Sequence, residues 1–239
     1  MTDIIYCDYL CESIDRGTAV FQYIRNLLQE LNIDFLISAL QRLVAVVLCL
    51  TVHETAHGLA AYLLGDRTAK EEGRLSLNPL RHVDLVGLAL LFTAGFGWAK
   101  PVPVDSRHFR NPKRGMAVTA LAGPASNILL AILLLLVCKV IYIYNNPGEF
   151  LVTAFYTLLY AVQLSIGLGL FNLIPIPPLD GSKILAVFMP DRVYYTLMRY
   201  EHYGIILLLI LSLTNVTGDL ISGAISIVYT ALINLILLG

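Results

Sequence analysis

The sequence predicts an all-α integral membrane protein, a polytopic bundle with four to six membrane helices. Of its 239 residues, 57% are hydrophobic and only 14% are charged, against about 25% charged residues in ordinary globular domains. Apolar stretches long enough to cross a bilayer recur along the chain, and its mean hydropathy is +0.74. The net charge of -1, without a lysine-rich block or zinc-finger spacing, argues against nucleic acid as a partner.

The first part of the chain, residues 1–35, is predicted to be an N-terminal amphipathic segment. Residues 18–32 alternate between apolar and polar at helical spacing, as in a helix that lies on the membrane surface or packs on the bundle. This start lacks the basic residues and long apolar run of a signal peptide. Cys7 and Cys11 could bridge or bind metal, although one pair of cysteines is a weak indication of either.

The first membrane span is predicted over residues 36–64 and contains the sequence HETAH. His53 and His57 are four residues apart, so on a helix both imidazoles project from one face and can hold one zinc ion. Glu54 lies beside them, where it can act as the general base on water. Such groups are costly in hydrocarbon unless they face a cavity, pair or bind an ion, which favours a functional site over a satisfied core helix of a soluble protein.

Residues 66–115 form the most charged part of the chain. Within them, residues 83–98 contain three glycines and one aspartate and suit a re-entrant loop or β-hairpin better than a crossing helix. The short alternating pieces on either side are predicted to be extended strands with exposed edges, or alternatively a mere connector. An exposed edge could add a substrate segment through main-chain hydrogen bonds, so Gly95, Gly97 and Pro101 are candidate substrate-binding residues.

Two further spans are predicted over residues 116–144 and 150–173. Asn127 lies about three turns inside the first of them, where an amide in apolar surroundings should hydrogen-bond inward. It is a candidate ligand for a substrate carbonyl and equally a candidate helix-packing contact. Asn172 ends the other span and is a candidate substrate-binding residue.

The stretch FNLIPIPPLDG, residues 171–181, follows. Three prolines in four residues forbid a regular helix, and exposed backbone at membrane depth is tolerable only where it lines a polar cavity. Catalytic zinc usually takes three protein ligands and a water, which makes Asp180 the natural third ligand. The weaker candidates for that place are Asp84, Asp219, His82, His108 and His202.

The distribution of positive charge predicts a multi-pass protein of the cell membrane. Nine of the sixteen Lys and Arg residues lie between residues 65 and 115, and three lie between 175 and 203. By the positive-inside rule both segments are cytoplasmic, and the turn at residues 145–149 is outside. The HETAH sequence and Asp180 therefore both approach the cytoplasmic half of the bilayer.

The end of the chain, residues 191–239, is predicted to form C-terminal membrane helices. Residues 204–238 are too long for one span and short for two, so we expect two helices broken near residues 215–219. Asp219 at that break is expected to cap a helix rather than to catalyse.

Three motifs together resemble the site-2 protease family of intramembrane zinc metalloproteases, peptidase family M50: HETAH, ALAGPASN and NLIPIPPLDG. The segments GRLSLNPLRHVDLVG and FGWAKPVPV resemble its compact prokaryotic branch. The resemblance covers about residues 40–190 and departs mildly at Ser182, where many relatives have glycine.

This resemblance implies a three-helix catalytic core, placed here in residues 36–190. It further implies that His53, His57 and Asp180 hold one Zn²⁺, that Glu54 activates water, and that Asn127 assists near the scissile carbonyl. The re-entrant region is expected to help clamp an unwound substrate helix.

The predicted function is zinc-dependent endopeptidase activity on peptide bonds in or near transmembrane helices, that is, regulated intramembrane proteolysis. The expected partners are a transmembrane protein or peptide substrate and the lipid bilayer. The alternatives are a catalytically silent homologue that binds membrane segments, a membrane metal transporter, and a metallopeptidase with glutamate as third ligand. No feature of the sequence specifies an oligomeric state.

Overall fold

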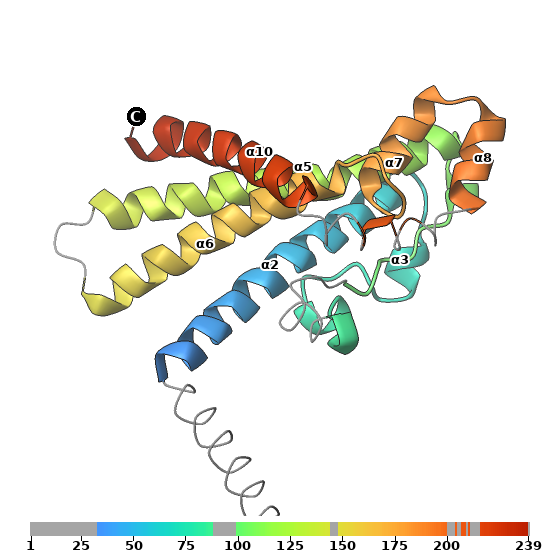
Figure 1. Cartoon of the computed structure of the whole chain (residues 1–239). Coiled ribbons are helices and arrows are strands. Elements are labelled where there is room, and N and C mark those ends of the chain that lie inside the picture. The colour runs from blue at the N-terminus through green and yellow to red at the C-terminus, as the bar shows by residue number, and fades with distance from the viewer. Residues whose placement is uncertain are drawn as a thin grey trace, which may run out of the picture. The chain divides into compact units, whose positions relative to one another are not determined.

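The computed structural model describes residues 33–87, 99–143, 148–199, 204, 207, 208, 210 and 216–238. The chain divides into two compact units, Met1–Leu43 and Val44–Gly239. The long helices are α2 (Ile33–Leu63), α5 (Pro112–Ile143), α6 (Glu149–Asn172) and α10 (Val216–Ile233) (Figure 1). The short elements are α3 (Thr68–Glu71), η1 (Pro79–Arg81), η2 (Ser106–His108), α7 (Asp180–Leu185), η3 (Ala186–Phe188), α8 (Asp191–Arg199) and the π-helical turn η4 (Asn234–Leu238).

Within the described residues, three helices are long and apolar enough to cross a membrane: Leu36–Leu63, Pro112–Ile143 and Glu149–Asn172. These are the three spans predicted from the sequence, each within a few residues of its expected bounds. A shorter apolar helix, Ile221–Leu237, follows near the C-terminus. The second helix of the predicted C-terminal pair, α10, begins at Val216, inside the expected break at residues 215–219, and Asp219 lies within this helix near its start. Residue 215 and the four residues before it lie outside the described residues. The N-terminal segment, with Cys7 and Cys11, also lies outside them.

Helices α5 and α6 lie side by side, and α10 packs against α6 (Figure 1). The buried centre of this packing is a cluster of Ala131, Leu135, Val162 and Ile166. Where apolar side chains lie in lipid as readily as in protein, helices associate through close packing of small residues. Gly169 on α6 provides such a place, because a Cβ there would lie 3.1 Å from the carbonyl oxygen of Pro124 on α5.

The part of α2 from Val44 onward contacts both α5 and α6. Its Cys49 Sγ lies 3.7 Å from the carbonyl oxygen of Ala161 on α6. Cys49 and Cys138 are buried and free, as expected for cysteines that act as small apolar residues in membrane helices. The contacts of α2 with α5 are those of the candidate site described below.

Helix α2 ends at a glycine. Gly65 has φ +108°, and the N–H groups of Gly65 and Asp66 donate to the carbonyl oxygens of Tyr62 and Ala61 at 3.1 and 2.9 Å. This pair of bonds is a Schellman motif, in which the residue of positive φ is usually glycine because it lacks a Cβ.

The carboxylate of Asp66 is fully buried and ties the end of α2 to the chain before α5. It accepts hydrogen bonds from the N–H and hydroxyl of Thr68 and, at 2.7 Å, from the N–H of Asp105. Nδ1 of His108 lies 3.0 Å from the same carboxylate. These bonds fix one end of the extended segment 99–105, which runs to the candidate site.

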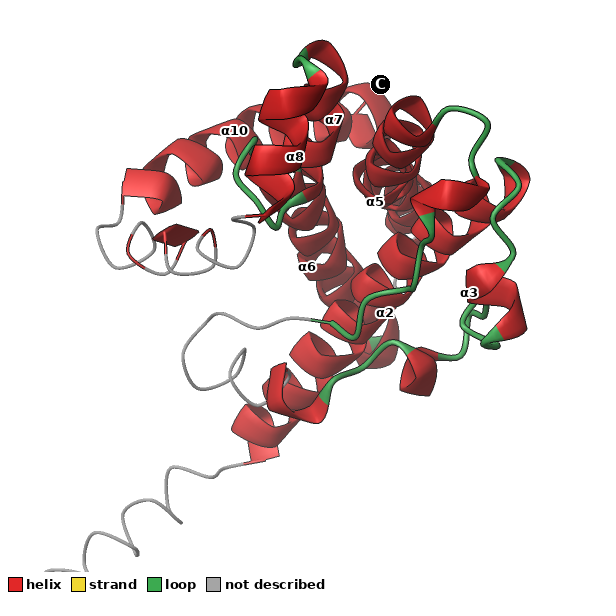
Figure 2. Cartoon of the chain, turned by 90° about the vertical axis from the view of Figure 1, so that its right-hand side faces the viewer, coloured by secondary structure: helices red, strands yellow, loops and turns green. Residues whose placement is uncertain are grey.

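The described part of the connection between α2 and α5 consists of loops and short helices, without a strand (Figure 2). The strands expected on either side of residues 83–98 are therefore not found in that part. Pro79 starts the 3₁₀ turn η1, and Pro101 and Pro103 have no N–H to offer a sheet. Residues 88–98, with Gly95 and Gly97, lie outside the described residues, so the re-entrant loop stays a prediction.

The buried side chain of Arg74 and one backbone hydrogen bond hold the segment 99–105 in place of a strand partner. Arg74 donates from Nη2 to the carbonyl oxygens of Lys100 and Pro101 at 2.7 and 3.0 Å. The N–H of Lys100 donates to the carbonyl oxygen of His82 at 2.8 Å. We call these three bonds, together with the Asp66 contacts, the loop clamp.

We predict that Asp66→Asn destabilises the protein by about 1.5–3 kcal/mol at neutral pH, because a buried charged acceptor loses part of its bonds. Burial raises the pKa of Asp66, but the hydrogen bonds that it accepts outweigh burial and hold its pKa below the ordinary value. Because the folded-state pKa is lowered, the ionised carboxylate stabilises the protein fully at pH values above its unfolded-state pKa of about 3.9. This stabilisation is lost as the pH falls through the folded-state pKa.

Thermal unfolding in detergent as a function of pH measures this effect. The difference between wild type and Asp66→Asn should be full at pH 7 and shrink below about pH 4. Asp105→Asn is the matched control, because that carboxylate pairs with the exposed side chain of Arg107 and should matter much less. Equal losses in the two variants would contradict the role given to Asp66.

Candidate active site

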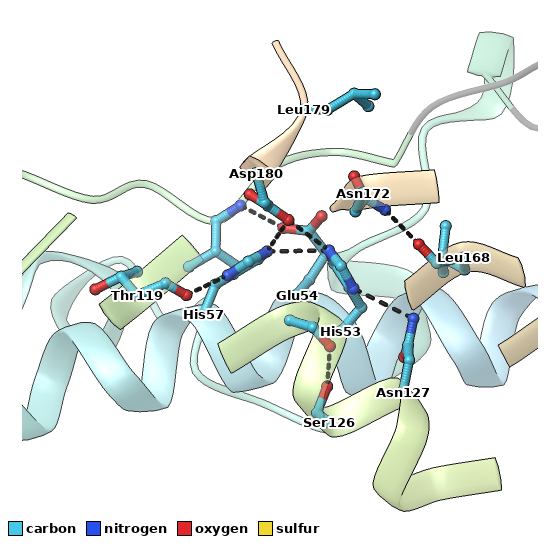
Figure 3. Close-up of polar contacts among 12 residues, drawn as sticks. His53, Glu54, His57, Thr119, Ser126, Asn127, Leu168, Asn172, Leu179 and Asp180 are labelled. Carbon is cyan, nitrogen blue, oxygen red and sulfur yellow. Dashed lines mark hydrogen bonds and ion pairs between the residues drawn. The ribbon is translucent and has the colours of Figure 1, made fainter. Parts of the chain in front are cut away.

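Three ligand-type side chains from two distant parts of the chain converge in the structure. Nε2 of His53 and Nε2 of His57, one turn apart on α2, are 3.0 Å from each other. Oδ2 of Asp180, the first residue of α7, lies 3.2 Å from Nε2 of His53 and 3.1 Å from Nε2 of His57 (Figure 3). All three residues are buried, and together they could hold one metal ion.

The size of this triangle suits zinc. Zinc bonds to histidine nitrogen and carboxylate oxygen are about 2.0–2.1 Å long, and at tetrahedral angles they hold ligand atoms about 3.3 Å apart. The sides of 3.0–3.2 Å are close to that separation. Two imidazoles and one carboxylate also match the ligand set of catalytic zinc sites, in which the fourth position stays open for water.

The proline-rich loop after α6 brings Asp180 to the histidines. Gly181 lies against the backbone at the end of α6, since a Cβ there would lie 2.5 Å from the carbonyl oxygen of Ile174 and closer still to that of Leu173. Glycine is thus required next to the aspartate. The hydroxyl of Ser182 donates to the carbonyl oxygen of Leu179 at 2.7 Å, so the buried serine has a partner within the loop.

Helix α5 supports both histidines from the side opposite Asp180. Nδ1 of His57 lies 2.7 Å from the carbonyl oxygen of Thr119, and Nδ1 of His53 lies 3.3 Å from the amide of Asn127 (Figure 3). Gly123 lies between these two contacts. A Cβ on Gly123 would lie 2.5 Å from Nε2 of His57 and 2.6 Å from Cε1 of His53, so only glycine leaves room for the rings.

The carboxylate of Glu54 faces the same cavity and is held by the loop clamp. Its Oε2 accepts a hydrogen bond of 2.9 Å from the N–H of Val102. Val102 follows directly after the two carbonyls that Arg74 binds. Sequence reasoning missed Val102, because a backbone donor can come from any residue except proline and leaves no pattern in the sequence. It missed Arg74 for a related reason, since the acceptors of its side chain are backbone carbonyl oxygens.

A cavity of about 290 Å³ joins these groups. It is lined by the three ligand-type residues, by Glu54, and by Pro101, Val102, Val104, Met116, Thr119, Ala120, Asn172, Pro178 and Lys183. Of the predicted substrate-binding residues, Pro101 and Asn172 line this cavity. Asn127 is fully buried beside His53, and Gly95 and Gly97 lie outside the described residues.

The weaker candidates for third ligand have other surroundings. Asp84 accepts hydrogen bonds from the N–H groups of Val86 and Gly87. His82 lies 2.6 Å from a carbonyl oxygen of the loop, and His108 contacts Asp66. Among the described residues, His53, His57 and Asp180 form the one group of this kind, without a glutamate. His202 lies outside those residues.

Comparison with known proteins agrees with this geometry. Residues 137–214 match the model of Peptidase family M50. The chain is 40% identical over 176 residues to a Bacillus subtilis protein named "Putative zinc metalloprotease YwhC", and this match covers 72% of the chain and 79% of that protein. The chain belongs to peptidase family M50, the site-2 protease family.

More distant M50 relatives carry a similar name. The chain is 28% identical over 173 residues to "Putative zinc metalloprotease Rip2" of Mycolicibacterium smegmatis and 31% identical over 174 residues to that of Mycobacterium tuberculosis H37Rv. Each match covers 64% of the relative. No solved structure matches the chain. Membership of family M50 and the buried His–His–Asp group both indicate that the ion of this site is Zn²⁺.

We predict that Gly123→Ala weakens metal binding by about 5- to 150-fold. Overpacking a close contact costs about 1–3 kcal/mol, and here the strain falls on the two imidazoles. Metal content after dialysis against a graded chelator measures the loss. Gly223→Ala on α10 is the matched control, because a Cβ there meets nothing within 4 Å. Unchanged metal binding in Gly123→Ala would show that the rings have more room than this packing allows.

Proposed function

We propose that this M50 protein is a zinc-dependent endopeptidase that hydrolyses peptide bonds in or next to the transmembrane helices of membrane proteins. The observation that carries the proposal is the convergence of His53, His57 and Asp180 on one cavity with Glu54, at one end of helices apolar enough for a membrane. An ionisable cluster in such helices is costly unless it serves a function.

In this proposal His53, His57 and Asp180 hold the ion, with aspartate as third ligand of the HExxH motif. When bound, zinc acts as a Lewis acid on water and on the scissile carbonyl. Glu54 takes the proton from the attacking water and delivers it to the leaving amine nitrogen. The N–H of Val102 orients the Glu54 carboxylate for this task.

A substrate helix must unwind before attack, because its peptide groups are hydrogen-bonded to one another. Pro101 and Asn172 line the cavity and are our candidates for contact with the unwound segment. Pairing of that segment with an exposed edge is proposed only for residues 95–98, which lie outside the described residues, because residues 99–104 form no strand. This pairing predicts that Gly97→Pro lowers the cleavage of a defined substrate. A proline at Val102 would not test it cleanly, since the N–H of Val102 already binds Glu54.

The proposed setting is the cell membrane, crossed several times, with the site towards the cytoplasmic half. The motif HETAH lies near the end of α2, and Asp180 follows shortly after the end of α6. The segments that continue from these ends carry twelve of the sixteen Lys and Arg residues, which favours a cytoplasmic location for both.

The first test is metal content by mass spectrometry on detergent-purified protein. We expect about one zinc per chain in the wild type and strong loss in both His57→Ala and Asp180→Ala, because each removes one of three ligands. Asp84→Asn is the control and should keep the ion, since its carboxylate binds backbone N–H groups elsewhere. Full retention of zinc in Asp180→Ala would mean that the third ligand is another residue.

The second test separates an enzyme from a catalytically silent homologue. Glu54→Gln should keep the zinc and lower the cleavage of a defined transmembrane substrate in proteoliposomes by about 10²–10⁴-fold, the usual contribution of a general base. A wild-type protein that holds zinc and cleaves none of a panel of transmembrane substrates would favour the silent homologue. Equal cleavage by Glu54→Gln and wild type would remove Glu54 from the mechanism.

A further inference from the structure

The two histidines differ in the neighbour that each meets at Nδ1. His57 meets the backbone carbonyl oxygen of Thr119 at 2.7 Å, and a carbonyl oxygen can only accept a hydrogen bond. His57 therefore carries a proton on Nδ1, which leaves the lone pair of Nε2 directed towards His53 and Asp180. This is the arrangement that a metal ligand requires.

His53 faces the same requirement but meets a side chain that can either donate or accept. Its Nε2 lies 3.0 Å from Nε2 of His57 and 3.2 Å from Oδ2 of Asp180, so Nε2 is the nitrogen directed at the metal site. The proton of a neutral ring then sits on Nδ1, which needs an acceptor. The atom of Asn127 placed there, at 3.3 Å, is the amide nitrogen, which can only donate.

A half-turn of the amide resolves this conflict. The oxygen and nitrogen of an asparagine side chain occupy nearly equivalent positions, and the assignment between them rests on the hydrogen-bond network. Oδ1 of Asn127 is buried and has no partner among the described residues. The half-turn places that oxygen against Nδ1–H of His53.

We propose that Asn127 is a positioning residue for His53: its carboxamide oxygen accepts a hydrogen bond from Nδ1–H and so fixes the ring orientation and tautomer that direct Nε2 at the metal. Partners of this kind are typical of histidine metal ligands. The inference deepens the proposed function, on which it rests. It assigns Asn127 to the support of the ion, whereas the family resemblance places it near the scissile carbonyl.

The packing around Asn127 favours support over substrate contact. Asn127 is 0% exposed, and its backbone carbonyl oxygen accepts a hydrogen bond of 2.8 Å from the hydroxyl of Ser165 on α6. A Cβ on Gly169 would lie 3.5 Å from Cβ of Asn127, so α6 closes over this side chain. The cavity is lined instead by Asn172, whose Nδ2 donates to the carbonyl oxygen of Leu168 at 3.0 Å.

The experiment compares Asn127→Leu with Asn127→Asp in the purified full-length chain. Leucine has a similar size without an acceptor, whereas aspartate keeps the shape and offers an acceptor at either end. The readouts are the zinc dissociation constant, from chelator competition, and the absorption spectrum of the Co²⁺-substituted protein, which reports the ligand geometry. We expect about 10- to 100-fold weaker zinc binding and an altered cobalt spectrum in Asn127→Leu. Asn127→Asp should bind zinc within a few-fold of the wild-type dissociation constant and should keep the wild-type cobalt spectrum.

Ser126→Ala is the control, since its hydroxyl binds the carbonyl oxygen of Gly123 and not a histidine. Wild-type zinc affinity in Asn127→Leu, or equal losses in Asn127→Leu and Asn127→Asp, would overturn the proposal. Unchanged affinity with lost cleavage would instead assign Asn127 to the substrate. If leucine prevents folding, Asn127→Ser replaces it in the experiment. The serine hydroxyl is too short to reach Nδ1 of His53, so we expect the same loss as in Asn127→Leu. Absence of zinc from the wild type would refute the proposed function itself.

Discussion

Buried polar groups in an apolar bundle must find partners, and this constraint organises the structure around His53, His57 and Asp180. Each imidazole uses one nitrogen towards the other two ligand-type residues and the other nitrogen towards α5. The carboxylate reaches them because a proline-rich loop ends α6 and a glycine lets the chain fold back on it. The long helices provide the frame, and a few contacts of about 3 Å between their ends determine the site.

The loop between α2 and α5 also has a direct part in the site. The buried carboxylate of Asp66 and the guanidinium of Arg74 fix the two ends of a short extended segment. Between them the N–H of Val102 reaches Glu54. Contacts made outside the apolar spans thus determine where the proposed base lies relative to the proposed metal ligands.

Sequence reasoning succeeded where chemistry and hydropathy are carried by side chains. The three long spans and the meeting of the HETAH motif with Asp180 were predictable, because apolar length and ligand type can be read from the residues. The strands expected around residue 100 are absent from the described part, where prolines remove the donors that a sheet needs. The bond from Val102 and the space at Gly123 were not predictable, since both depend on backbone positions that only the folded chain defines.

The space at Gly123 makes ion binding and helix association one thermodynamic event in the proposed enzyme. The rings proposed to bind the ion are also the surface on which α5 packs against α2, so separating these helices would disperse the proposed ligands. By linkage, an ion that binds the packed state alone stabilises that packing in proportion to its free concentration and affinity. The zinc supply of the cell would therefore set the fraction of chains with an assembled core as well as the fraction able to catalyse.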